Sequence, residues 1–172
     1  MRDTQIEKDY ILTWILAGIS HHERLSTLMG FKGGTVLKKV YFEDYRYSED
    51  LDFTLLDDSI LNEEIFTCFQ QVFNWIKEEA NIALQIIEDA EHESGSSNFY
   101  MAYTGPPGGT SINKKAKVDI TRKEILEFEP SPKPVFIHYS DMNSFKILCY
   151  PLEEVLIEKM CALMGRTQPR DL

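Results

Sequence analysis

Two aspartates two positions apart, Asp50 and Asp52, give the clearest chemical signal in the sequence. They alternate with Leu51, Phe53 and Leu55, the pattern of a strand with one apolar face, so both carboxylates should project from the opposite face. Neighbouring carboxylates repel each other unless a cation lies between them, and hard oxygen ligands suit Mg²⁺ or Mn²⁺. The pattern indicates a divalent-metal site, and its alternative is an exposed acidic strand end.

A glycine turn, Gly33-Gly34-Thr35, precedes a helical pattern by sequence. Paired glycines let a backbone approach a ligand closely, and a helix N-terminus presents free N–H groups to an anion. The turn could bind phosphate, although a Gly-Gly pair is more often only a turn.

A third acidic residue, Asp119, lies at the centre of a second strand pattern, Lys117 to Thr121. A carboxylate from a neighbouring strand would complete a site for two metal ions about 3.5–4 Å apart, as used in phosphoryl displacement. On its own, Asp119 would be read as a solvated strand residue.

These side chains need a sheet to hold them, and the hydrophobic periodicity supplies one. Helices are expected at about 5–19, 21–29, 36–41, 61–80 and 151–164, and strands at about 50–55, 82–88, 98–104, 116–121, 134–138 and 145–149. The predicted class is α/β or α+β, with a mixed sheet flanked by helices in one domain, residues 1–172.

The charge balance limits the kinds of partner. The net charge of −10 argues against a protein that coats nucleic acid or membranes, although residues 41–93 alone carry −13. The chain shows no signal-peptide pattern and no apolar run of the roughly 20 residues that span a membrane. Three cysteines without ligand spacing indicate reduced core thiols, so we expect a cytoplasmic protein without membrane contact.

Other polar and aromatic groups allow two interpretations each. Arg46 could pair with Glu49 or reach a phosphate. A basic cluster could be a solvated edge or could approach RNA or nucleotide, and two tyrosines before it could pack or stack a base. The cluster and the tyrosines are Lys114, Lys115, Lys117, Arg122, Lys123, Tyr100 and Tyr103.

As a set, the motifs resemble those of the DNA polymerase beta-like nucleotidyltransferase superfamily. More closely, they resemble the AbiEii/AbiGii toxin family, the nucleotidyltransferase toxins of abortive-infection and type IV toxin–antitoxin systems. The segments that carry this resemblance are 6–10 (IEKDY), 32–37 (KGGTVL), 46–53 (RYSEDLDF) and 158–163 (EKMCAL).

The resemblance implies a role for each motif position. Asp50, Asp52 and Asp119 would bind the metals, and Asp119 would help deprotonate the attacking hydroxyl. The nucleotide would be bound by Gly33, Gly34, Thr35, Arg46, Ser48 and Lys159. Asp171 matches the start of the family's closing R-D-x-x-D motif, but the sequence ends before that motif's second acid and before the helical C-terminal region of many members.

The implied activity is metal-dependent transfer of a nucleoside monophosphate from a nucleoside triphosphate to a hydroxyl. Acceptor candidates are the tRNA 3′ end and a protein hydroxyl, and an antitoxin is an expected partner. The alternative is a non-catalytic module that binds a nucleotide or a partner. Retention of Asp50, Asp52, Asp119 and Lys159 together favours the enzyme.

Overall fold

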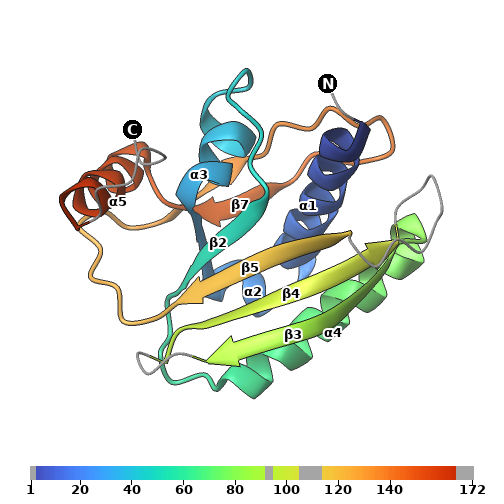
Figure 1. The fold of residues 1–172 in the computed structure, drawn as a ribbon, viewed down its shortest axis with the longest axis horizontal. Coiled ribbons are helices and arrows are strands. Elements are labelled where there is room, and N and C mark those ends of the chain that lie inside the picture. Colours follow the sequence, from blue (N-terminus) through green and yellow to red (C-terminus); the bar gives the residue numbers. More distant parts are fainter. Residues whose placement is uncertain (1–2, 92–94, 105–113, 166–172) are drawn as a thin grey trace.

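The computed structural model describes residues 3–91, 95–104 and 114–165, and Figure 1 shows their arrangement. The helices are α1 (Asp3–His21), α2 (Leu25–Leu28), α3 (Gly33–Val36), the π-helix η1 (Leu37–Tyr41), α4 (Asn62–Ala80) and α5 (Leu152–Gly165). The strands are β1 (Met29–Lys32), β2 (Asp50–Leu55), β3 (Ala83–Glu91), β4 (Ser97–Thr104), β5 (Lys115–Thr121), β6 (Ser131–Pro134) and β7 (Lys146–Cys149).

The seven strands of the described residues form one mixed sheet in the order β3-β4-β5-β2-β1-β7-β6. The pairs β2–β5 and β1–β7 are parallel, and the other neighbours are antiparallel. The predicted class, a mixed sheet flanked by helices, is confirmed.

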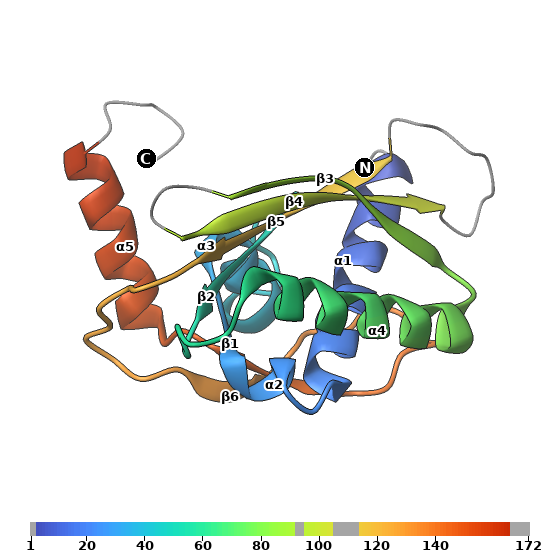
Figure 2. The same ribbon diagram turned by 90° about the horizontal axis from the view of Figure 1, so that it is seen from below.

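Helices α1 and α4 cover one side of the sheet, whereas no described helix lies across the other side of β3, β4 and β5 (Figure 2). The buried face of α4 carries Ile65, Phe69, Val72, Phe73 and Ile76. Gly18 lets α1 approach α4, because a Cβ there would lie 2.6 Å from Cγ1 of Val72. The core is therefore on the helical side, and polar groups of the central strands are left for the other side.

The central strand β1 was not predicted from the sequence, which indicated a helix to about residue 29 and then a turn. All four of its residues are buried. A strand covered on both faces lacks the alternation that marks a half-buried strand. Its place between β2 and β7 brings the glycine turn that follows it to the middle of the sheet.

The strand predicted at 134–138 is wrong; β6 occupies Ser131–Pro134 instead. It forms an edge of the sheet, where its two prolines are tolerated because a missing N–H disrupts no second ladder. Beyond Pro134, the backbone N–H of Phe136 bonds to the carbonyl of Lys39 at 2.7 Å and leaves the ladder.

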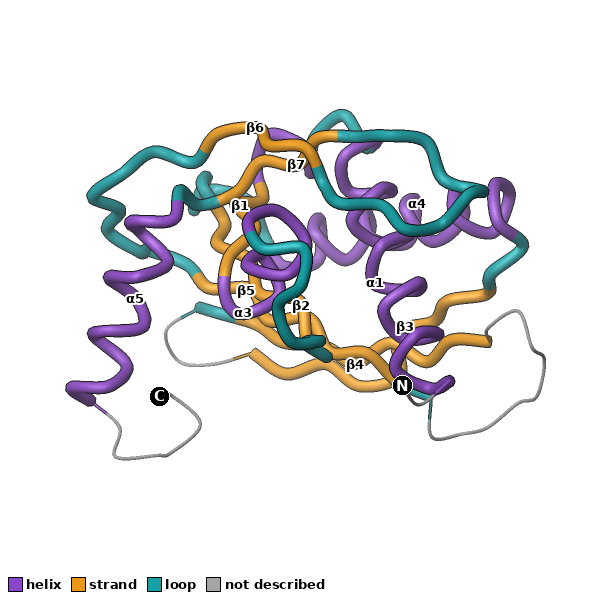
Figure 3. The backbone as a smooth tube through the Cα atoms, turned by 90° about the horizontal axis from the view of Figure 1, so that it is seen from above, coloured by secondary structure: helices purple, strands orange, loops and turns teal. Residues whose placement is uncertain are grey.

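A buried ion pair fixes α1 to the segment after the glycine turn. Nζ of Lys39 lies 2.7 Å from Oδ2 of Asp9, and both side chains are almost fully buried. Lys39 also donates to the Thr13 hydroxyl, and Asp9 accepts from Tyr139, each at 2.7 Å. Because Lys39 lies in η1, the pair ties α1 to the helical segment that follows the turn. Figure 3 shows α3, which begins that segment, between α5 and α1.

Two expectations from composition have separate outcomes. Cys68 and Cys149 are buried as expected, but Cys161, on α5, is exposed. Within the described residues, none of the helices has the length and apolar character needed to cross a membrane.

Candidate active site

The three predicted carboxylates meet on adjacent strands. Asp52 of β2 is paired directly with Asp119 of β5 on one side and with Lys32 of β1 on the other. Two residues earlier on the same strands, Asp50 is paired with Lys117. Directly paired residues project from the same face, so acids and lysines lie side by side in two short rows.

The glycine turn lies against the first row. Gly33 has a φ of +76°, and a Cβ built on it would stand 2.2 Å from Oδ2 of Asp52. Only glycine fits this combination of positive φ and close approach. Gly33 and Gly34 are partly exposed beside buried neighbours, so the backbone of the turn is accessible next to the Asp52 carboxylate.

Thr35 supports β2 in this structure. Its side chain is buried, and its hydroxyl donates to the Asp50 carbonyl at 2.5 Å. The Ser48 hydroxyl, by contrast, lies near the turn, 3.6 Å from where a Cβ on Gly34 would stand. The predicted contact of Thr35 with a triphosphate stays a prediction.

Burial and mutual repulsion raise the proton affinity of both β2 carboxylates. Burial, followed by the charges of Asp119 and Asp50, raises the pKa of Asp52 to about 6. Asp50 is more exposed than Asp52, but partial desolvation and the charge of Asp119 likewise raise its pKa, although Lys8 and Lys117 oppose the shift. A divalent cation between the carboxylates would relieve this repulsion, so the donor set fits a hard metal ion.

Asp119 has a cationic partner of its own: Nζ of Lys117 lies 2.7 Å from its Oδ1. Burial alone would lower the pKa of Lys117, but the hydrogen bond to Asp119 and the negative charge of that carboxylate outweigh burial and raise it. Among the described residues, no three His, Cys, Asp or Glu side chains are arranged as a ready metal-ligand cluster. Metal binding by three carboxylates would therefore require a change in side-chain conformation.

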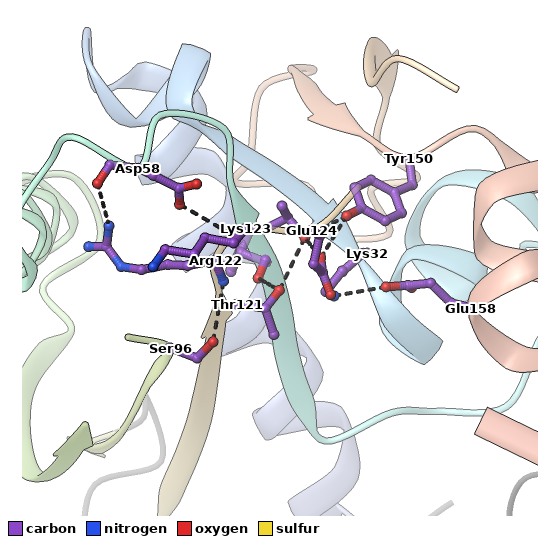
Figure 4. A network of polar contacts seen from close by, with 11 residues as sticks. Lys32, Asp58, Ser96, Thr121, Arg122, Lys123, Glu124, Tyr150 and Glu158 are labelled. Atoms are coloured by element: carbon purple, nitrogen blue, oxygen red, sulfur yellow. Dashed lines mark hydrogen bonds and ion pairs between the residues drawn. The ribbon is translucent and has the colours of Figure 1, made fainter. Parts of the chain in front are cut away.

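On the β1 side, Lys32 is held between two glutamates (Figure 4). Its Nζ lies 2.5 Å from Oε1 of Glu124 and 2.8 Å from Oε1 of Glu158, and Lys32 itself is 7% exposed. Glu158 is on α5, so the lysine links the active-site edge of β1 to that helix. The second oxygen of Glu124 accepts from the hydroxyls of Thr54 and Tyr150.

The two glutamates respond differently to burial. Burial raises the pKa of Glu158, and Lys32 only partly offsets it. For Glu124 burial acts in the same direction, but the hydrogen bonds from Lys32 and Thr54 outweigh it and leave its pKa below the ordinary value. Its additional hydroxyl donors explain why Glu124 is the better-stabilised carboxylate.

Lys159 and Arg46, which were also predicted, take no part in the contacts described above. Lys159 follows Glu158 on α5, is half-buried, and forms no hydrogen bond or ion pair with any other described side chain. Arg46 is exposed and does not pair with Glu49, whose carboxylate instead lies 3.2 Å from Nζ of Lys8. Asp171 is outside the described residues.

Sequence reasoning missed Lys32, Glu124 and Glu158 as parts of this site, and it placed Lys117 in a basic cluster without predicting its contact with Asp119. That contact could have been found, because Lys117 lies two positions before Asp119 on the same strand face. The glutamates gave no local signal. They meet Lys32 across 92 and 126 positions of the chain.

A glycine turn and three carboxylates on the central strands of a mixed sheet are the arrangement expected of a nucleotidyltransferase. Residues 14–172 match the family described as "Nucleotidyl transferase AbiEii toxin, Type IV TA system". The chain therefore belongs to this family of nucleotidyl transferase toxins of type IV toxin–antitoxin systems.

A solved structure supports the fold independently. The crystal structure of JHP933 from Helicobacter pylori superposes with a TM-score of 0.65 at 16% sequence identity. The match covers 99% of this chain and 64% of that one, so this chain spans less than two thirds of its structural relative. No curated protein sequence matches the chain.

Proposed function

We propose that this protein is a metal-dependent nucleotidyltransferase that transfers a nucleoside monophosphate from a nucleoside triphosphate to an acceptor hydroxyl. The observation that carries the proposal is the contact of Gly33 with Asp52, which is paired directly with Asp119. It puts an accessible backbone turn, suited to phosphate oxygens, beside acids suited to a divalent cation.

Asp50, Asp52 and Asp119 would hold Mg²⁺ or Mn²⁺. When bound, the metal would neutralise charge on the reacting phosphate and on the leaving oxygens. The raised pKa values of Asp50 and Asp52 support this assignment, because a cation between the carboxylates would relieve the mutual repulsion that contributes to both shifts.

The other residues position the nucleotide. N–H groups of Gly33 and Gly34 would bind its β- and γ-phosphates, with Ser48 beside them. Lys159 and Arg46, which have no anionic partner among the described residues, would contact the remaining phosphate oxygens. Thr35 would contribute by fixing Asp50 and the turn, in addition to the predicted phosphate contact.

In the reaction, the acceptor oxygen forms a bond to the α-phosphorus. The bond from that phosphorus to the bridging oxygen breaks, and its electron pair leaves with pyrophosphate. Asp119 accepts the proton of the attacking hydroxyl. Holding the two reactants in line accounts for most of what the protein contributes.

The proposed biological role is that of a toxin in the cytoplasm, countered by an antitoxin. The tRNA 3′ end is the first candidate acceptor, and a protein hydroxyl is the second. No described helix covers the β4 and β5 side of these carboxylates (Figure 2), which is compatible with either acceptor.

The test is to incubate the protein with each α-labelled nucleoside triphosphate, Mg²⁺ and total tRNA, with Asp52→Asn as the control. Label should pass to RNA or protein with the wild-type chain and not with Asp52→Asn. Nucleotide binding is measured separately, as thermal stabilisation that depends on Mg²⁺ or Mn²⁺. Stabilisation without transfer to any acceptor would contradict the enzyme and favour a non-catalytic binding module.

A further inference from the structure

Beyond Asp119, the open face of the sheet carries an aromatic ring beside two ammonium groups. Tyr100 of β4 is paired directly with Lys117 of β5, and Ala102 is paired with Lys115. Nζ of Lys115 lies 4.5 Å from the centre of the Tyr100 ring. We call Tyr100, Lys115 and Lys117 the β4–β5 face.

Two similar residues nearby, Tyr103 and Arg122, do not belong to this face. Tyr103, on the same strand, is 8% exposed, and its side chain belongs to the core. Arg122, in the same basic cluster of the sequence, is bound to the Ile60 carbonyl and the Asn62 side chain, each at 2.7 Å. Tyr100 alternates with core residues and faces the carboxylate side. Asn98, two positions before it, is the residue paired with Asp119, so the Tyr100 ring lies diagonally across from that carboxylate.

The order of the strands gives the reaction a direction. The glycine turn contacts Asp52 from the β1 side, whereas Asp119 lies on β5, the opposite side. In an in-line displacement, the attacking and leaving oxygens lie on opposite sides of the phosphorus. If the turn binds the leaving phosphates, the acceptor approaches over β5 and β4.

We propose that the β4–β5 face binds the terminal nucleoside of a single-stranded polynucleotide acceptor, with its base stacked on Tyr100. This inference rests on the proposed nucleotidyl transfer. The base takes the position that the Lys115 ammonium now holds on the ring, and Lys115 turns to a backbone phosphate. Strands lie about 4.8 Å apart, so a base on Tyr100 of β4 leaves its sugar over Lys117 of β5, two residues along the strand from Asp119.

A nucleic acid fits this face better than a polypeptide does. Polypeptides commonly bind to sheets by adding a strand to a free edge. Both β4 and β5 are paired on each side within the sheet and offer no edge. An aromatic ring with flanking cations on an open sheet face is a general arrangement for stacking bases and neutralising phosphates.

Direct binding tests the face without requiring turnover. A fluorescent single-stranded RNA pentamer is titrated in Mg²⁺ without nucleotide, using anisotropy. Tyr100→Leu, which keeps an apolar strand residue, should weaken binding by about tenfold, as expected from loss of one base stack. Tyr100→Phe keeps the ring and should bind within twofold of wild type, to about the same level as the remote control Lys146→Gln.

A pentamer that lacks its 3′-terminal base identifies the stacked nucleoside. It should bind the wild-type chain about tenfold more weakly than the intact RNA does, but bind Tyr100→Leu as the intact RNA does. Equal affinities of wild type and Tyr100→Leu would overturn the proposal. If Tyr100→Leu fails to fold, the wild type and Tyr100→Phe with the two RNAs still decide it, because an unchanged affinity without the base overturns stacking.

Transfer assays separate this inference from the proposed function. RNA binding that depends on Tyr100, without transfer to any acceptor, supports the face and contradicts the enzyme. Transfer that is unaffected by Tyr100→Leu, or transfer to protein by a chain that binds no RNA, overturns the face and leaves the enzyme. If Tyr100→Leu raises the KM for RNA but leaves the thermal stabilisation by nucleotide unchanged, both the β4–β5 face and the enzyme are supported.

Discussion

The backbone of Gly33 lies so close to Asp52 that a Cβ on the glycine would stand 2.2 Å from a carboxylate oxygen. The same glycine has a φ of +76°. Both features come from the sharp turn between β1 and α3, which brings the phosphate-binding candidate and the metal-binding candidate into contact.

Gly33→Ala should therefore separate stability from activity. The added methyl group displaces the Asp52 side chain, and misplacement by about 1 Å can lower a rate about a hundredfold. Positive φ adds about 1–2 kcal/mol of instability. Urea unfolding and labelled-nucleotide transfer measure the two effects.

Gly95 provides the matched control for that substitution. It also has positive φ, but a Cβ there would lie 3.5 Å from Arg122, an ordinary contact. Gly95→Ala should lose similar stability and keep transfer activity. Equal activity losses in the two variants would contradict a specific role for the contact of Gly33 with Asp52.

Asp52→Asn should stabilise the metal-free protein while abolishing transfer. In the unfolded chain Asp52 loses its proton near pH 4, whereas its pKa in the folded protein is about 6. The folded state binds the proton more tightly, so this group lowers stability as pH rises from 4 to 6. Above pH 6 the full penalty, about 3 kcal/mol, is present, and asparagine removes it.

Unfolding in EDTA at pH 4 and pH 7.5 measures this effect. The stability difference between Asp52→Asn and wild type should be present at pH 7.5 and absent at pH 4. Asp57→Asn is the opposite control, because hydrogen bonds from Ser59 lower the pKa of Asp57. A variant at Asp52 that is less stable than wild type at pH 7.5 would disprove the poorly compensated charge.

Lys32→Met should destabilise the protein by about 2–4 kcal/mol, because it leaves Glu124 and Glu158 partly buried without their shared cation. Adding Glu124→Gln and Glu158→Gln should restore part of that loss by removing the uncompensated charges. Urea unfolding of the single and triple variants provides the comparison. If the triple variant loses as much stability as the separate substitutions added together, the ion-pair explanation is contradicted.

Asp9→Asn tests the attachment of α1. Removing one charge of the buried pair with Lys39 should lower stability by about 3–5 kcal/mol. Arg24→Gln breaks the exposed pair with Glu64, which should contribute less than about 1 kcal/mol. Similar midpoints of thermal unfolding for the two variants would contradict this account.

The sequence determined the parts of the site that depend on local periodicity. Alternation placed Asp50 and Asp52 on one face of a strand, and the strand pattern around Asp119 anticipated the third acid. These predictions succeed because strand geometry reverses side-chain direction at every residue. The motif order also indicated the family that the match over residues 14–172 shows.

Tertiary structure decided the features that arise between distant segments. It placed β1 inside the sheet between β2 and β7, put Tyr100 on the face opposite the helices and Tyr103 in the core, and gave Lys32 its two glutamates. No local pattern could specify them, since a strand buried on both faces has no alternation and an ion pair across 92 or 126 positions forms only when the sheet assembles.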